Sequence, residues 1–333
     1  MRYLIVTWFV FLIGAFLFWL VTRYAQRKFF RLVHKLATLQ LALVVAAPAV
    51  TGGYWYWYTH RAVPDSTQET LYEGIVYTRD VRQEPHPVII HVVEIDLDAP
   101  GVGFLVTPGE PVEGEEVEAR RTTDFLDEFD LQVAINGDYF DAPTADTTHA
   151  RPGTRLDVKG YASSEGLVYS MGYASFPTLY ISDDNQAQFG APIGEVYNAI
   201  SGDYIFLRNG VFQADGLRWP GHYQRHPRTA VALDGDAQTL FLIAVDGRQP
   251  NYSEGVTLEE LAEIVLEYGG ETALNLDGGG STTLVVEGEA GRPLKLNSPI
   301  DRRLPGRERP VANHLGVFAT TPKSTETAEQ STG

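Results

Sequence analysis

The chain has 333 residues, of which 44% are apolar or aromatic, and this is sufficient for a globular domain that needs no disulfide or metal to hold it together. It has no cysteine, which excludes disulfide bonds and thiol catalysis. Residues 1–60 contain six Lys or Arg and no acid, so the remaining residues contain 20 basic and 43 acidic side chains, a balance that excludes nucleic acid as a partner of the general surface.

Two apolar stretches predict a membrane anchor over residues 1–58. Residues 3–21 contain no charge and approach the roughly 20 residues that span a bilayer, and residues 36–58 end in an aromatic run typical of the membrane interface. Residues 22–35 contain five Lys or Arg and no acid, which predicts a cytoplasmic loop and a periplasmic or extracellular position for the rest of the chain. An alternative is a cleaved leader with a small-residue cleavage site at 47–49, which would also export the domain.

The remainder predicts one strand-rich domain over residues 85–319. It follows a polar linker at 59–84 that contains one short strand, and it precedes a polar tail at 320–333, which we expect to be disordered. Short apolar or alternating runs predict strands at 88–97, 102–106, 131–136, 178–181, 204–207, 230–233, 240–245, 273–276 and 283–286.

Two helices are predicted within this domain. Thr257 and Glu260 form a capping-box pattern before an amphipathic run, and glycines at 269 and 270 supply the stop. A shorter helix is predicted at 123–129 by the spacing of its apolar residues. The fold class is therefore α+β, with few helices packed on a strand-rich core.

Several of the predicted strands end in a glycine turn that carries polar side chains. The clearest is the loop after strand 273–276, where Asp277 is followed by three glycines and Ser281. Glycine has no Cβ, so such a loop can present backbone N–H groups to an anion or a sugar oxygen. The same form recurs at 134–140, 200–203 and 242–248, and a cation precedes an apolar strand in the segment 226–234.

Taken in order, these segments resemble the phosphodiester glycosidase family from about Val88 to Phe318. The motifs that carry the resemblance are IDLDAPGVGF, AINGDYF, ISGDYIFLRNG, HPRTAVALD, VDGR followed by YSEGVTLEELAEIV, LNLDGGGSTT and RPVANHLGVF. The resemblance implies hydrolysis of a sugar joined through C1 to a phosphodiester. One departure is local: the family often has two glycines after the asparagine of the second motif, whereas this chain has Gly137 and Asp138.

Such chemistry needs a carboxylate near the sugar and cations near the phosphate. We therefore predict Asp277 and Asp246 as catalytic carboxylates. Predicted to bind substrate or phosphate are Arg248, Arg228, Asn136, Asp138, Gly278, Gly279, Gly280 and Ser281. The alternative for the acids is turn capping, for the arginines a surface salt bridge, and for Asn136 a structural bond to a neighbouring loop.

The predicted function is a membrane-anchored hydrolase that cleaves a glycosyl-1-phosphodiester in an envelope or extracellular glycan. The alternative is a non-hydrolytic glycan-binding or exopolysaccharide-assembly protein that uses the same pocket. The expected partners are a phosphate-linked glycan and the membrane, and no cofactor or metal is expected to be required. Carboxylates in the pocket are also ligands that Ca²⁺ accepts, but the sequence does not show the oxygen geometry that such a site needs.

Overall fold

The computed structural model describes residues 2–22, 27–112, 114–142, 150–217 and 219–320. The chain divides into two compact units, Met1–Arg61 and Ala62–Gly333. The predicted disordered tail at 320–333 lies outside the described residues, apart from its first residue.

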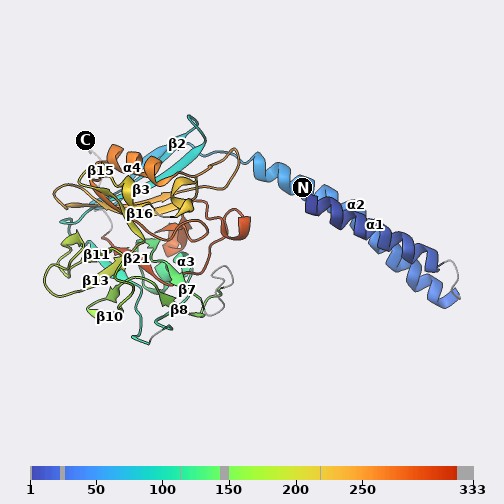
Figure 1. Cartoon of the computed structure of the whole chain (residues 1–333), viewed down its shortest axis with the longest axis horizontal. Helices are drawn as coiled ribbons and strands as arrows, with labels where there is room; N and C mark the ends of the chain where they lie inside the picture. Colours follow the sequence, from blue (N-terminus) through green and yellow to red (C-terminus); the bar gives the residue numbers. More distant parts are fainter. Residues whose placement is uncertain (1, 23–26, 113, 143–149, 218, 321–333) are drawn as a thin grey trace, which may run out of the picture. The chain divides into compact units, whose positions relative to one another are not determined.

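The first unit is a pair of helices, α1 (Arg2–Thr22) and α2 (Arg27–Thr59), which lie side by side (Figure 1). Their large apolar side chains are mostly exposed where they are described, as expected of a surface that contacts lipid or another protein. Within the described residues one segment, Val33–Thr59, is long and apolar enough to cross a membrane, and Val10–Trp19 is a shorter apolar stretch. By composition and place the longer segment fits either a membrane span or a signal sequence.

The second unit is strand-rich, which confirms the predicted fold class. Its largest sheet has eight strands in the order β1-β2-β3-β17-β16-β18-β14-β15. These strands are β1 (Thr67–Tyr72), β2 (Ile75–Arg82), β3 (Val88–Asp96), β14 (Tyr204–Arg208), β15 (Val211–Phe212), β16 (Arg228–Leu233), β17 (Thr239–Val245) and β18 (Thr272–Asn275).

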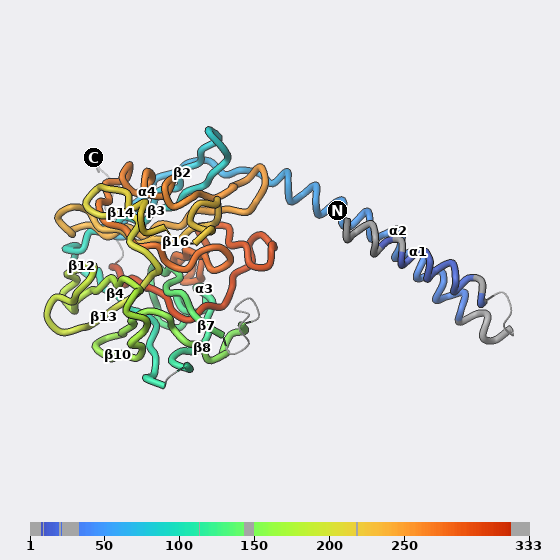
Figure 2. Tube along the Cα trace, in the orientation of Figure 1, coloured from blue at the N-terminus to red at the C-terminus, as the bar shows by residue number. Residues whose placement is uncertain are grey.

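Three smaller sheets complete the strand core. One contains β9 (Ala162–Ser164), β10 (Leu167–Ser170), β11 (Thr178–Ile181), β12 (Ala187–Phe189) and β13 (Asn198–Ser201). Another contains β4 (Gly103–Val106), β6 (Val133–Asn136), β19 (Leu284–Glu287), β20 (Pro293–Lys295) and β21 (His314–Phe318). The last contains β5 (Val117–Glu118), β7 (Phe140–Asp141) and β8 (Arg155–Val158). Figure 2 shows β10, β12 and β13 gathered on the side of the unit away from β2 and α4.

The main core lies between the eight-stranded sheet and the smaller sheets, and period-2 alternation along the strands assigns side chains to it. In β17, residues Leu240, Leu242 and Ala244 pack in this core, whereas Phe241, Ile243 and Val245 pack on the opposite face against α4 (Leu258–Glu267). A third cluster joins α3 (Thr122–Glu128) to β4, β6 and β19. The inner strands of the eight-stranded sheet, such as β16 and β17, are therefore buried on both faces.

The predicted capping box at the start of α4 is confirmed. The Thr257 side chain accepts the Glu260 N–H, the Glu260 carboxylate accepts the Thr257 N–H, and Gly269 follows the helix with φ +91°. All nine predicted strands are present with boundaries shifted by two residues or fewer. Short 3₁₀ turns occur at Ala214–Gly216, Pro220–Tyr223, Glu289–Gly291 and Asp301–Arg303.

Residues 59–84 differ from the prediction of a linker with one short strand. They contain two strands, β1 and β2, which pair with each other, and β2 pairs along its whole length with β3. The difference arises because β1 is largely exposed at the edge of the sheet, so its sequence is polar and lacks the apolar alternation of a covered strand.

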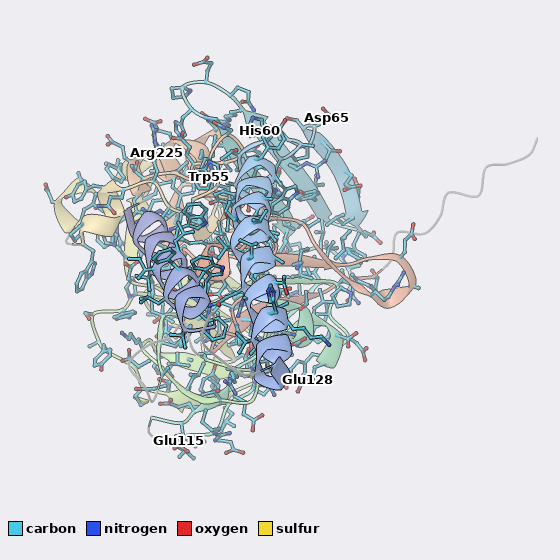
Figure 3. All side chains as sticks on the ribbon, turned by 90° about the vertical axis from the view of Figure 1, so that its right-hand side faces the viewer. Trp55, His60, Asp65, Glu115, Glu128 and Arg225 are labelled. Atoms are coloured by element: carbon cyan, nitrogen blue, oxygen red, sulfur yellow. The ribbon has the colours of Figure 1, made fainter. Side chains whose placement is uncertain are left out.

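Exposed acids such as Asp65, Glu115 and Glu128 lie on widely separated parts of the second unit (Figure 3).

Candidate active site

The order of strands in the eight-stranded sheet brings four chain segments together at one end. Asn275, the last residue of β18, pairs with Tyr204 at the start of β14 and with Ala230 near the start of β16. Arg228, the first residue of β16, pairs with Val245 at the end of β17. Because these neighbours are antiparallel, the loops that leave β17 and β18 meet the loops that enter β14 and β16.

A cavity of about 310 Å³ lies at this meeting point, which is within the range of ligand-binding clefts. Six of the predicted site residues line it: Arg228, Arg248, Asp277, Gly278, Gly279 and Gly280. The other lining residues are Tyr139, Asp203, Trp219, Gly221, His222, His226, Pro227 and Arg309. The cavity therefore combines three arginines with two carboxylates and two histidines.

Asp277 is the partly exposed acid of the glycine loop. Its backbone N–H donates to the Gly137 carbonyl at 3.0 Å, and its Oδ2 accepts the Ser281 hydroxyl at 2.6 Å. Burial raises the pKa of the Asp277 carboxyl to about 6, an effect that the Ser281 hydrogen bond and the Arg309 charge oppose and the Asp203 charge adds to. A carboxyl group that titrates near neutrality can accept or donate a proton during a reaction.

The three glycines of this loop make room for their neighbours. Only Gly279 of the three has a positive φ, +66°, and its N–H donates to the Pro227 carbonyl at 2.9 Å, so that N–H is already used within the protein. A Cβ at Gly279 would lie 3.0 Å from both terminal nitrogens of Arg248, and a Cβ at Gly280 would overlap the Arg309 guanidinium. The loop therefore serves less as a row of N–H donors than as a surface on which two arginines lie.

Arg248 and Arg309 are the cations of this surface. Arg248 has φ +57°, a conformation that is uncommon for a residue with a side chain, and its Nε donates to His226 Nδ1 at 3.3 Å. Burial, followed by the Arg248 and Arg228 charges, lowers the pKa of His226 to about 4, so the imidazole is neutral at pH 7. Arg309 donates from Nη1 to Ser281 Oγ at 3.3 Å and from Nε to Asp301 at 3.1 Å.

Arg228 also lines the cavity but is held in another way. It is 5% exposed, and its guanidinium donates to three backbone carbonyls, those of Val256 at 3.0 Å, Gly221 at 2.6 Å and Gln224 at 2.9 Å. These bonds fix the loop before β16. Arg228 thus contributes positive charge to the cavity, while most of its N–H donors bind backbone carbonyls of the surrounding loops.

Asp246, predicted as the second catalytic carboxylate, does not line the cavity. It is 1% exposed and accepts hydrogen bonds from the Ser298 N–H at 2.8 Å and the Asn297 side chain at 3.1 Å, with His91 Nε2 at 3.4 Å. The physical reason is alternation: Asp246 follows Ala244 by two residues and so continues the face of β17 that points into the main core.

Three further predicted residues support the site from within the protein. Asn136 is buried, accepts from Thr229 and Thr283, and donates to the Asp277 carbonyl at 2.6 Å, which positions the loop. Ser281 is buried and bonds the Asp277 carboxylate. Asp138 lies outside the cavity lining and accepts from the Ser201 N–H and the Asn313 amide, while burial raises the pKa of its carboxyl well above the usual range.

Asp203 is the second carboxylate of the cavity, and the sequence reasoning did not select it. Its Oδ2 lies 2.8 Å from His222 Nε2, and its Oδ1 accepts from the Asn275 side chain at 2.7 Å. The Asn275 amide also donates to the Tyr139 hydroxyl at 2.9 Å, and burial raises the pKa of that phenol well above its usual range. The signal for Asp203 was present, because the 200–203 segment has the same strand-to-glycine-turn form as the Asp277 loop.

Arg309 and His222 were also missed. Arg309 follows no predicted strand, and the surrounding segment 301–310 contains three other arginines with nothing to distinguish it from them. His222 and His226 have the i, i+4 spacing of metal ligands on a helix, but Gly221 and Pro227 beside them disfavour such a helix, so the sequence does not select His222. Among the described residues, no group of three or more His, Asp or Glu side chains is arranged to hold a metal ion.

Comparison with known proteins identifies related chains. The family model for phosphodiester glycosidases matches residues 129–318. An uncharacterised prophage-derived protein of Bacillus subtilis, YomE, is 39% identical over 71 residues, which are 21% of this chain and 11% of that protein. The chain thus spans about a tenth of the length of this curated relative.

Two solved structures share the fold. A hypothetical protein from Synechocystis superposes with a TM-score of 0.59 at 16% identity, covering 78% of this chain and 64% of that one. The catalytic domain of zebrafish N-acetylglucosamine-1-phosphodiester alpha-N-acetylglucosaminidase, auto-inhibited by its pro-peptide, superposes with a TM-score of 0.53 at 22% identity, covering 79% and 86%. The segment matched by the family model is more than half of the chain, and the chain therefore belongs to the phosphodiester glycosidase family.

Proposed function

We propose that the chain is a hydrolase that cleaves the bond between C1 of a sugar and the oxygen of a phosphodiester. The observation that carries the proposal is the placement of the Asp277 carboxyl, with a pKa of about 6, in a cavity that also contains Arg248 and Arg309. Three arginines converge there although acids outnumber bases by more than two to one after residue 60. Membership of the phosphodiester glycosidase family supports the same reaction.

The arginines would hold the phosphate. A guanidinium group is planar and presents two N–H donors to two phosphate oxygens, so Arg248 and Arg309 on the glycine loop fit an anionic group with two exposed oxygens. Their charge also stabilises the phosphate monoester as it departs with the electrons of the C1–O bond. Such a leaving group needs little protonation, which removes the need for a strong acid beside it.

Asp277 would act as the general base. Water attacks C1 of the sugar as the C1–O bond breaks, the Asp277 carboxylate takes one proton from that water, and the products are a reducing sugar and a phosphate monoester. The Ser281 hydroxyl favours the ionised carboxylate by donating to it at 2.6 Å. Asp203 is held by His222 and Asn275 and places a second negative charge in the cavity. This charge would stabilise the oxocarbenium-like transition state.

The proposed setting is the outer face of a membrane. The apolar segments of α1 and α2 would form two spans, the basic residues at 22–35 would remain in the cytoplasm, and the second unit would face the periplasm or the exterior. The substrate would then be an envelope or extracellular glycan that contains a sugar 1-phosphodiester.

The test is hydrolysis by the full chain in detergent. Methyl phosphodiesters of α- and β-linked sugar 1-phosphates are incubated with the wild type, with Asp277→Asn, and with Asp236→Asn as a matched change at an exposed acid. We expect release of reducing sugar by the wild type and by Asp236→Asn, and its loss in Asp277→Asn. Binding of these esters without release by any of the three proteins would instead support the non-hydrolytic glycan-binding function.

A further inference from the structure

A second cavity, of about 470 Å³, is lined by far more positive than negative charge. Its charged lining residues are Arg121, Arg151, Lys295, Arg302, Arg307 and Glu308. Arg121, Arg151, Arg302 and Arg307 are exposed, Lys295 is partly exposed, and Glu308 is buried. Such a concentration of cations differs sharply from the acidic balance of the chain after residue 60.

Among the described residues, three acids are paired with cations of this lining. The Glu308 carboxylate accepts the Thr123 N–H at 3.1 Å and the Thr123 hydroxyl, and lies 3.5 Å from the Lys295 ammonium. Asp301 lies 3.2 Å from Arg307 and 3.7 Å from Arg302. Asp124 lies 3.8 Å from Arg121. The five cations of the lining therefore exceed these three acids, and a local excess of like charge creates a positive potential that attracts anions.

This second cavity is next to the candidate active site, and one carboxylate connects them. Asp301 is buried; its Oδ1 accepts from Arg309 at 3.1 Å, and its Oδ2 lies 3.2 Å from Arg307. Arg309 lines the first cavity and Arg307 lines the second. The guanidinium groups of Arg309 and Arg307 thus lie beside the two oxygens of one carboxylate. The cations of the two cavities are therefore close together, and one extended anion could contact both sets.

We propose that the second cavity binds another phosphate group of the same substrate, so that the substrate is an oligomeric or polymeric sugar phosphate with repeated phosphodiesters. This inference rests on the proposed function and specifies its substrate class. A substrate polymer with one phosphate in the first cavity would pass over Asp301, Arg307 and Arg309. Its next phosphate would then contact the Arg and Lys side chains of the second cavity. A substrate with a single phosphodiester would contact only the arginines of the first cavity.

The test compares two substrates and two variants of the full chain in detergent. The substrates are a trimer of N-acetylglucosamine units joined by 1,6-phosphodiesters and the methyl phosphodiester of N-acetylglucosamine 1-phosphate. The variants are Arg151→Glu, in the second cavity, and Arg208→Glu, an exposed arginine on β14 that lines neither cavity. A charge-assisted hydrogen bond to phosphate contributes about 1.5–3 kcal/mol, which is roughly tenfold or more in affinity.

We expect Arg151→Glu to raise KM for the trimer about tenfold, with kcat unchanged and with no change for the methyl ester. Arg208→Glu should behave as the wild type on both substrates, and equal unfolding temperatures of the variants would confirm that both fold. An equal KM of the two variants for the trimer would overturn the inference while leaving the hydrolase function intact. So would a trigalacturonate that competes with the trimer at equal concentration, because the cavity would then select carboxylates as well.

Equilibrium binding separates this inference from the proposed function. If no protein released sugar from either ester, the proposed function would fail. Tighter binding of the trimer than of the methyl ester by the wild type, lost in Arg151→Glu and kept in Arg208→Glu, would still support the second phosphate site. Equal binding of the two esters by the wild type would overturn it.

Discussion

Two strands of the eight-stranded sheet are followed by the same dipeptide, Asp-Gly, and yet the two acids lie in different places. β17 ends before Asp246-Gly247, and β18 ends shortly before Asp277-Gly278. Asp277 lines the candidate active site, whereas Asp246 is buried beneath the 297–298 segment. Position at a strand end therefore predicts that a residue lies near the site, and the face of the strand decides whether its side chain reaches the cavity.

Alternation explains the difference. Asp246 is two residues beyond Ala244 and shares its inward face, whereas Asp277 comes one residue after the buried Leu276 and points away from it. The sequence of β17 could not reveal this, because both of its faces are apolar. One face packs in the main core and the other against α4. Only the tertiary arrangement tells which face of such a strand leads to solvent.

The largest effect should come from Asp277→Asn, which tests whether the acid that lines the cavity is catalytic. Removing a general base typically costs 10²–10⁴-fold in rate, and we expect a loss of about that size in kcat. Initial rates of sugar release measure it, with substrate binding followed separately. A loss smaller than about tenfold would show that Asp277 is not the base.

Asp246→Asn tests the structural half. The Asn side chain retains the shape but places an NH₂ group against the Ser298 N–H or the Asn297 amide, so that buried donors face one another. Leaving buried polar groups unsatisfied costs about 1–3 kcal/mol each, and we expect unfolding in urea to show a loss of roughly 2–4 kcal/mol. The kcat of the folded fraction should stay near that of the wild type. A large fall in kcat without loss of stability would return Asp246 to a catalytic role.

Much of the fold was predictable because its strands carry their own apolar patterns. The nine predicted strands and the capping box of α4 needed only local information. The edge strand β1 and several short strands, such as β5 and β7 of two residues each, were missed, because short or polar strands are defined by their pairing partners. In the site, Asp277 and Arg248 were predicted from glycine turns, whereas Arg309 reaches the cavity from a loop and is placed by Asp301 and Ser281.

Variants of Arg248, which follows β17, would show a smaller effect on substrate binding. Arg248→Ala removes a guanidinium that lies on Gly279, and we expect KM to rise about 10- to 100-fold because charge-assisted hydrogen bonds to phosphate contribute about 1.5–3 kcal/mol. Arg248→Lys should recover only part of this, since an ammonium lacks the planar pair of donors. Steady-state kinetics on one phosphodiester would measure both variants. An equal KM for Arg248→Ala and the wild type would exclude phosphate binding by this residue.

The smallest effect concerns stability against pH. Folding raises the pKa of Asp277 from 3.8 to about 6, so between these values the folded chain binds more protons than the unfolded chain. The stabilising contribution of the protonated carboxyl is therefore fully present below pH 3.8 and is lost as the pH rises through 6. Asp277→Asn removes this dependence, so its unfolding temperature relative to the wild type should be higher at pH 7.5 than at pH 4.

The pH dependence of turnover should follow the same group in the opposite sense. A general base must be ionised, so kcat/KM of the wild type should rise with pH through about 6 and then level off. A fall through the same pH would make Asp277 the proton donor to the leaving phosphate. Because Asp246 lies outside the cavity, Asp246→Asn should leave the midpoint of this profile in place, whereas Arg309→Ala should raise it by removing a charge that favours the ionised Asp277.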